Sequence, residues 1–279
     1  MDNYPVKLIE QPTVIVMADM TLDPQGVRGL LDWVKEYRPE CVPGENPLPG
    51  DLFPHDMMEG DRVLTGNELL VELSGRNCYH SYGAKAGRKS NHDYIAHTQQ
   101  GTVPHRSIMY HAKMTFFVAG ISRRVSHEII RHYVGADRTE EGSPSQESTR
   151  YTEHPGHFIV PPKVLADGED AVKRFHLAVY MGYQAYRNYI GIECEKWKSA
   201  HGTQPKGIDR KRIYESAAGL LPMQAATSVM WTANPVSLAK MFLERTHESA
   251  DAEFQRLARV WQDLCLARWP NLFHKAEQP

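Results

Sequence analysis

The stretch SIMYHAKMTFFV, from Ser107 to Val118, decides the fold class that this sequence predicts. Apolar side chains occupy every second position of this stretch, and His111, Lys113 and Thr115 stand between them. A period of two is typical of a strand with one buried face, so we expect an unusually long half-buried strand. Its apolar face comprises Ile108, Tyr110, Ala112, Met114, Phe116 and Val118.

The segments on either side of this strand mix further strands with helices. Asp23-Pro24 and Asn234-Pro235 are typical helix starts, because a capping side chain directly precedes a proline. Strands are predicted at 7–10, 13–17 and 226–231, and helices at about 24–38, 122–132 and 169–199, from 235 onward, and in a last segment that ends before 270. Because these elements follow no regular alternation of strand and helix, the sequence predicts an α+β fold.

Length and composition favour a single domain over residues 1–279 with two surface insertions. A chain of 279 residues can bury a sizeable core. Residues 39–60 are rich in proline, glycine and acidic side chains, and 134–144 are polar, so both predict surface loops.

The overall charge and hydropathy argue against several kinds of partner. A net charge of −2 gives no basic footprint for nucleic acid or for an anionic membrane. No apolar run approaches the ~18 residues that a membrane span needs. The cysteines are scattered, with no CxxC pair, so we expect a protein of the reducing cytoplasm without disulfides. They are Cys41, Cys78, Cys194 and Cys265.

The segment SHEIIRHY, from Ser126 to Tyr133, contains a His-Glu pair followed by a second histidine. A helical zinc motif places its histidines four residues apart on one face. His127 and His132 are five apart, which separates them by about 140° around a helix. The sequence therefore predicts no metal site. Arg131 becomes the residue of interest, although an ion pair with Glu128 on the helix surface explains it equally well.

Two further segments carry candidate binding groups. Arg245 continues the apolar stripe of Leu238, Met241 and Phe242, so its guanidinium needs an anion, a carbonyl or a carboxylate partner. A stem that extends to solvent, or an ion pair inside the core, would satisfy it as well. SQESTRY, residues 145–151, gathers hydroxyls, an amide, a carboxylate and an arginine, which suit phosphate or carboxylate binding but are also common in a solvated loop.

Other catalytic signatures are missing from the sequence. No GxSxG elbow and no cysteine in a recognisable motif marks a nucleophile. Neither GxGxxG nor a P-loop is present, so any nucleotide cofactor is held by another fold.

Taken in order, five segments resemble the flavin-dependent thymidylate synthases (ThyX). The resemblance runs from about Val6 to Phe273. Its family signature is Arg-His-Arg, a seven-residue gap, and a serine shortly before Arg-Tyr. The matching segments are GRNCY (75–79), HRSIMYH (105–111), GISR (120–123) with SHEIIRH, SQESTRY, and Leu221-Pro222 through Asn234 to Arg245.

The resemblance implies a fold, a set of ligands and an assembly. The fold is a central, twisted, mainly antiparallel sheet flanked by helices, and the chain forms a homotetramer with active sites at subunit interfaces. The ligands are FAD, UMP or dUMP, 5,10-methylenetetrahydrofolate and NADPH. The implied flavin-site residues are His105, Ser107, Tyr110, Arg131, His132, Tyr133, Asn234 and Lys240. The implied nucleotide-site residues are Glu128, Arg131, Gln146, Glu147, Ser148, Arg150, Lys211 and Arg245.

The family chemistry implied for this chain is methylation of uracil at C5 without a covalent enzyme adduct. Arg245 would polarise the pyrimidine carbonyls as the catalytic residue, while reduced flavin supplies hydride. Arg150 with Ser148 would hold the phosphate, because a planar guanidinium matches a dianion.

The chain departs from the family pattern in four places. Tyr133 replaces the last residue of Arg-His-Arg, and the gap from Tyr133 to Ser148 is fourteen residues. Ala218 and Val236 stand where the family carries arginines. These changes make the chain similar to the UMP/dUMP C5-methylases of nucleoside-antibiotic pathways such as polyoxin biosynthesis. An ordinary dUMP-specific thymidylate synthase and a flavin- and nucleotide-binding protein without methylase activity remain the alternatives.

Overall fold

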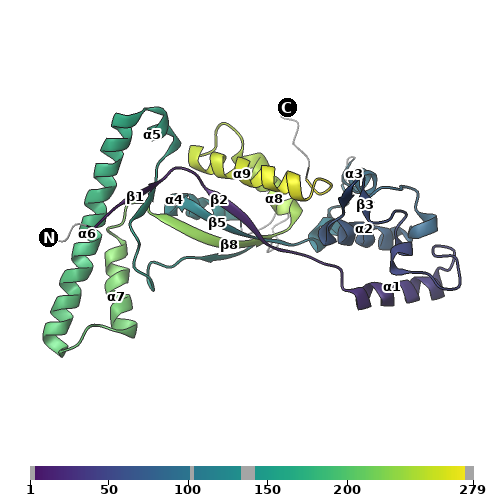
Figure 1. The fold of residues 1–279 in the computed structure, drawn as a ribbon, viewed down its shortest axis with the longest axis horizontal. Helices are drawn as coiled ribbons and strands as arrows, with labels where there is room; N and C mark the ends of the chain where they lie inside the picture. Colours follow the sequence, from purple (N-terminus) through teal and green to yellow (C-terminus); the bar gives the residue numbers. More distant parts are fainter. Residues whose placement is uncertain (1–3, 101–103, 133–141, 274–279) are drawn as a thin grey trace.

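A computed structural model describes residues 4–100, 104–132 and 142–273. Its centre is a four-stranded antiparallel sheet with the strand order β2-β5-β8-β6 (Figure 1). The strands are β2 (Thr13–Asp19), β5 (Met114–Ser122), β8 (Ala226–Ala233) and β6 (Gly142–Gln146). Two smaller pairs accompany it: β1 (Lys7–Ile9) lies parallel to β7 (His157–Ile159), and β3 (Met58–Glu59) pairs with β4 (Arg62–Val63).

The strand predicted at 107–118 is confirmed in its centre and wrong at both ends. Residues Arg106–His111 form a 3₁₀ helix, η3, and β5 continues to Ser122. The neighbouring strands decide this boundary, because Met114 is the first residue of β5 that faces partners, Asp19 on β2 and Ala233 on β8. The alternating residues before Met114 therefore have no neighbouring strand to pair with, and pairing between distant strands overrides the local pattern.

One face of the sheet carries the main core. Phe116 packs edge-to-face against Trp261 and Trp269, with ring centroids 5.1 and 5.9 Å apart. Helices α4 (Arg123–Ile129), α8 (Pro235–Arg245) and α9 (Ala252–Arg268) supply the rest of this core (Figure 1). The opposite face carries Ile15 and Met17, whose side chains are 47% and 53% exposed.

Two lobes flank the sheet at opposite ends of the molecule (Figure 1). One contains α1 (Pro24–Tyr37), α2 (Gly66–Tyr79) and α3 (Asn91–Gln99); the other contains α5 (Pro162–Ala166), α6 (Glu169–His201) and α7 (Gly207–Ala218). The helices predicted at 24–38, 122–132, 169–199 and after 235 are confirmed as α1, α4, α6, α8 and α9. Helices α2, α3 and α7 were not predicted, because their apolar residues are poorly segregated to one side.

The segment 39–60, predicted as a surface loop, has a mostly irregular backbone with many exposed residues, but it also contributes side chains to the core. Cys41, Val42, Leu52 and Phe53 are buried in the core of the α1–α2 lobe, and Pro49–Leu52 forms a 3₁₀ helix, η1. Proline and glycine mark turns but do not show whether the apolar side chains between them are buried. The second predicted insertion lies mostly outside the described residues, and its last residues, from 142, belong to β6.

The capping predictions are confirmed. Asp23 accepts hydrogen bonds from the backbone N–H groups of Gln25 and Gly26 at the start of α1, and Asn234 accepts one from Ser237 at the start of α8. Of the helices described, none has both the length and the apolar character that a bilayer crossing needs.

His154 is buried and makes a polar contact at each ring nitrogen. Its Nε2 is 3.2 Å from the Ala226 carbonyl oxygen, and its Nδ1 accepts from the Gly156 N–H at 3.2 Å. Because the ring is buried, the pKa of His154 is lowered from 6.5 to about 4. The imidazole is therefore neutral in the folded protein at neutral pH.

This lowered pKa predicts a pH-dependent free energy of unfolding. Between pH 6.5 and pH 4 the unfolded chain binds a proton at His154 that the folded chain does not bind, so stability is lost as the pH falls. His154 alone accounts for up to roughly 3 kcal/mol of this loss. We expect His154→Gln to flatten the pH dependence measured by urea unfolding, whereas exposed His201→Gln should not. Equal pH dependence in wild type and His154→Gln would contradict this account.

Candidate active site

The end of α8 brings Arg245 against α4 and the following 3₁₀ turn η4 (Ile130–His132). Its Nη1 donates to Glu128 Oε2 at 3.0 Å, and its Nε donates to His132 Nε2, also at 3.0 Å. The guanidinium carbon lies 5.0 Å from the centre of the Phe254 ring, and the side chain is 18% exposed. No acceptor for Nη2 occurs among the described residues. Arg245 is thus an ion-paired, half-buried cation with one donor group to spare.

His132 acts as a neutral acceptor toward this cation. A guanidinium only donates, so the Nε2 atom of His132 carries no proton and its Nδ1 does. Burial, followed by the nearby charges of Arg245, Lys240 and Arg131, lowers the pKa of His132 from 6.5 to about 4. The protonated Nδ1 faces the Glu244 carboxylate at 3.8 Å, beyond hydrogen-bonding distance. The ring therefore orients Arg245 without adding a second positive charge.

The ion pair considered between Glu128 and Arg131 is not formed. Arg131 is exposed, and within the described ranges it makes no hydrogen bond or ion pair. Arg124 makes a long ion pair with Glu128 at 3.9 Å and also pairs with the carboxylates of Asp251 and Glu253. The shorter contact of Glu128 is with Arg245, and Arg131 is left facing solvent.

The segment SQESTRY begins as a strand, not as a loop. Gln146 lies in β6, and its Nε2 donates to Ser126 Oγ at 2.8 Å, which joins the segment to α4. The Glu147 N–H donates to the Ser228 carbonyl at 3.0 Å, and its own carbonyl accepts from Arg123 at 3.3 Å. These bonds occupy Gln146 in a structural contact and hold the start of SQESTRY beside α4.

Arg150 and Lys211 meet around a carboxylate that the sequence analysis missed. Arg150 Nε donates to Glu215 Oε1 at 2.7 Å, and Lys211 Nζ lies 3.9 Å from the same oxygen. Lys211 also lies 4.9 Å from the centre of the Tyr151 ring. Ser148 Oγ accepts from the Arg150 N–H at 3.3 Å, which agrees with a hydrogen-bonding role. Glu215 stands four residues after Lys211 on α7, and that spacing was the available signal.

The residues implied for a flavin gather where η3 meets the start of α8. His105 precedes η3, Ser107 and Tyr110 lie within it, and Asn234 caps α8, which packs against η3. Three buried atoms here have no hydrogen-bond partner: His105 Nδ1, Asn234 Nδ2 and Ser237 Oγ. Lys240, on the same helix, lies 3.9 Å from Glu244. Tyr133 lies outside the described residues. Buried polar atoms without partners suit a site that a polar ligand completes.

Most of the predicted residues therefore fall into three groups, whereas the resemblance implied two sites. Arg245, Glu128 and His132 are in direct contact, and His132 joins the nucleotide set to the flavin set. Ser148, Arg150 and Lys211 form a second group around Glu215, and the η3 residues with Asn234 form the third. A half-buried guanidinium with a spare donor is suited to polarising a carbonyl. The orphaned polar atoms near the start of α8 are suited to a bound polar ligand.

Comparison with known proteins assigns a class to this fold and site. A family model described as "Thymidylate synthase complementing protein" matches residues 62–271. Flavin-dependent thymidylate synthases from Mycobacteroides abscessus and Mycobacterium tuberculosis are 31% and 32% identical to this chain, covering 69% of it and 73% of each relative. The chain belongs to the flavin-dependent thymidylate synthase family and is an enzyme of that class.

Solved structures share the fold. The UMP/dUMP methylase PolB from Streptomyces cacaoi, bound with 5-Br dUMP, superposes with a TM-score of 0.60 at 18% identity, covering 96% of this chain and 95% of that one. ThyX from Helicobacter pylori with FAD and dUMP gives a TM-score of 0.51 at 19% identity, covering 74% and 95%. The expected ThyX-like α+β fold is confirmed.

The Arg150–Glu215 pair predicts how an anionic ligand binds. A phosphate on Arg150 competes with Glu215, and an exposed ion pair of this kind is worth about 0.2–1 kcal/mol. We expect Glu215→Gln to lower the Kd for a uridine monophosphate by about twofold to fivefold, measured by calorimetry. Glu195→Gln, at an exposed carboxylate on α6, is the control. Weaker binding by Glu215→Gln would mean that Glu215 supports the ligand rather than competing with it.

Proposed function

We propose that this chain methylates C5 of a uridine nucleotide, UMP or dUMP. The carbon donor is 5,10-methylenetetrahydrofolate, the hydride comes from reduced FAD, and NADPH is the reductant. The observation that carries the proposal is Arg245, which is fixed by Glu128 and His132 and keeps Nη2 for a ligand oxygen. Family membership supports the reaction type.

The residues around η3 fit a flavin. His105, Ser107, Tyr110 and Asn234 would hold it, and the unpartnered His105 Nδ1 and Asn234 Nδ2 are polar atoms that a bound ring or its phosphates can satisfy. Bound reduced flavin supplies the hydride that converts the transferred one-carbon unit to a methyl group. Arg131, exposed beside His132, would extend the contact between flavin and nucleotide.

Arg245 supports the reaction electrostatically. Making C5 of uracil nucleophilic moves negative charge onto a pyrimidine carbonyl oxygen, and a donor already fixed at that oxygen lowers the barrier. Glu128 and His132 hold the guanidinium in place before the substrate arrives, so little reorganisation accompanies the charge shift. Because His132 is neutral, it accepts the hydrogen bond from Arg245 Nε and does not repel the guanidinium.

The cysteines do not suit covalent catalysis. Burial raises the pKa of the Cys41, Cys194 and Cys265 thiols, which disfavours the thiolate that attack would need. Cys78 is exposed and donates from Sγ to the Ser74 carbonyl on its own helix. Activation of the ring without a cysteine adduct is consistent with these positions.

We further propose a single-domain subunit in a homotetramer whose active sites are shared. The open face of the sheet places Ile15, Phe117 and Met230 side by side in register, and Ile15 is nearly half exposed. An exposed apolar row of this kind suits a subunit interface. The candidate residues lie in separate groups within one subunit. Such groups suit active sites in which a neighbouring subunit supplies the missing residues.

Relaxed sugar specificity is the finer part of the proposal. Ala218 stands on α7 where the family carries an arginine, so bulk and positive charge are missing from this position. The PolB structures, which contain 5-Br UMP or 5-Br dUMP, support this relaxed choice by analogy. The smaller side chain leaves room for a ribose 2′-hydroxyl and for a water that satisfies it, which avoids the cost of an unsatisfied buried hydroxyl.

Removing Arg245 tests the mechanism. We expect Arg245→Ala to lower kcat at least about a hundredfold, the usual scale for one preorganised donor to a developing oxyanion. Single replacement of Cys41, Cys78, Cys194 or Cys265 by alanine should leave turnover within about tenfold. A cysteine variant that folds, binds FAD and is inactive would contradict the mechanism.

Product analysis with both nucleotides tests the substrate. With FAD, NADPH and methylenetetrahydrofolate, we expect C5 methylation of UMP with kcat/KM within about a hundredfold of that for dUMP. Ala218→Arg should shift the preference toward dUMP. A methylated product from dUMP alone would favour an ordinary thymidylate synthase, and no product from either would favour a binding protein without methylase activity.

A further inference from the structure

Asn67 is a fully buried residue in the first turn of α2, and its side chain makes two hydrogen bonds to the backbone of Lys113, between η3 and β5. Its Nδ2 donates to the Lys113 carbonyl at 3.0 Å, and its Oδ1 accepts from the Lys113 N–H at 3.0 Å. A side-chain amide that satisfies both polar groups of one residue replaces the partner that a neighbouring strand would supply.

Lys113 needs such a partner because the sheet ends beside it. Met114 is the first residue of β5, and it pairs with Asp19 on β2 and with Ala233 on β8. One residue earlier, neither neighbouring strand offers a ladder partner, and the chain turns into the 3₁₀ helix η3, whose C-cap is the buried Ala112. Short 3₁₀ helices have poor hydrogen-bond geometry and need support from elsewhere.

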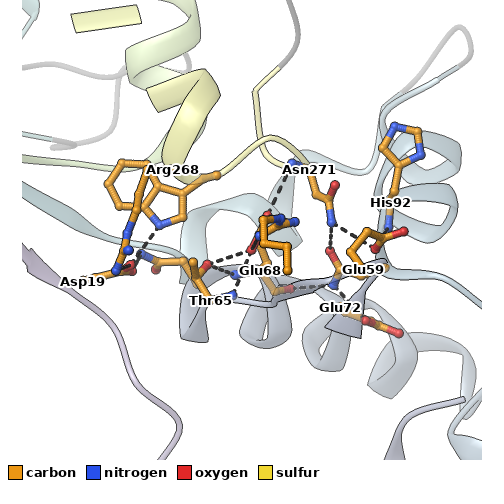
Figure 2. Close-up of polar contacts among 12 residues, drawn as sticks. Asp19, Glu59, Thr65, Glu68, Glu72, His92, Arg268 and Asn271 are labelled. Carbon is orange, nitrogen blue, oxygen red and sulfur yellow. Dashed lines mark hydrogen bonds and ion pairs between the residues drawn. The ribbon is translucent and has the colours of Figure 1, made fainter. Parts of the chain in front are cut away.

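Asn67 is itself held from the other side. Its Nδ2 also donates to Asp19 Oδ1, and Asp19 Oδ2 accepts from Trp269 Nε1 at 3.0 Å. Gly66 permits this close approach, because a Cβ there would lie 2.0 Å from the Met20 carbonyl oxygen. Figure 2 shows Asp19 at one end of a row of polar groups that continues through Thr65 and Glu68 to Asn271.

We infer that Asn67 is a positioning residue for the flavin site, an inference that rests on the proposed function. The junction that it grips carries Ser107 and Tyr110 on one side, and Asn234 follows Ala233, the strand partner of Met114. Asn67 hydrogen-bonds to Lys113 and Asp19, and not to any proposed flavin residue in the described part of the chain. It holds the backbone that connects η3 to β5. The position of this backbone determines where Ser107 and Tyr110 lie relative to the start of α8.

Asn91 provides a matched control within the same polar row. It is fully buried, donates from Nδ2 to the Glu68 carbonyl at 3.1 Å and to Glu72 Oε2 at 2.8 Å, and accepts from Asn271 at 2.8 Å. It makes no hydrogen bond to the η3–β5 junction. Asn91→Ala and Asn67→Ala therefore each remove a buried amide of equal size. Only Asn67→Ala also removes the hydrogen bonds to the Lys113 backbone.

The test is FAD titration of apoprotein, followed by flavin fluorescence, together with thermal unfolding of the apoproteins. We expect Asn67→Ala to raise the Kd for FAD at least about tenfold, whereas Asn91→Ala stays within about twofold despite a similar loss of thermal stability. Should Asn67→Ala fail to fold, Asn67→Asp keeps the volume, removes the donor to the Lys113 carbonyl and is expected to weaken FAD binding likewise.

Two results would separate the possible failures. Equal FAD affinity in the Asn67 variants and wild type, or equal weakening in the Asn67 and Asn91 variants, would overturn the positioning role and leave the proposed function intact. Wild-type protein that binds no FAD would refute the proposed function itself, and with it the role of Asn67.

Discussion

The contact between Arg245 and its two acceptors, Glu128 and His132, is the constraint on which the account of this site depends. The carboxylate neutralises the guanidinium, which a half-buried cation requires. The neutral imidazole accepts from Nε and fixes the orientation of Arg245, while Nη2 remains available to a ligand. If His132 were protonated, two cations would face each other and the Nε hydrogen bond would be lost.

The antiparallel sheet explains why this contact forms. β5 ends at Ser122, where α4 begins. β8 runs antiparallel to it and ends at the other end of the strands, where Asn234 caps α8. Helix α8 has 11 residues and runs about 16 Å back along the sheet. Its first residue therefore stands beside η3, while its last, Arg245, reaches α4. One helix thus connects the residues proposed for the flavin site with Arg245, the residue proposed to polarise the substrate.

The sequence predicted the local parts of this arrangement well. The Asn234-Pro235 cap, the apolar stripe of α8 and the need of Arg245 for a partner all follow from neighbouring residues. The identity of that partner does not, because Glu128 and His132 lie more than a hundred positions away in the chain. The start of β5 was missed for the same reason, because distant strands define it. The spacing from Lys211 offered a local signal for Glu215, but its pairing with Arg150, 65 positions away, did not follow from the sequence.

The clearest measurement of the central claim is the protonation state of His132. Nitrogen-15 NMR of histidine-labelled protein, with the His132 signals assigned by their loss in His132→Gln, reports both charge and tautomer as the pH is varied. The account predicts a ring that stays neutral from pH 7 to pH 5, with its proton on Nδ1, consistent with the lowering of the pKa of His132 to about 4. Protonation near pH 6.5, or a proton on Nε2, would contradict it.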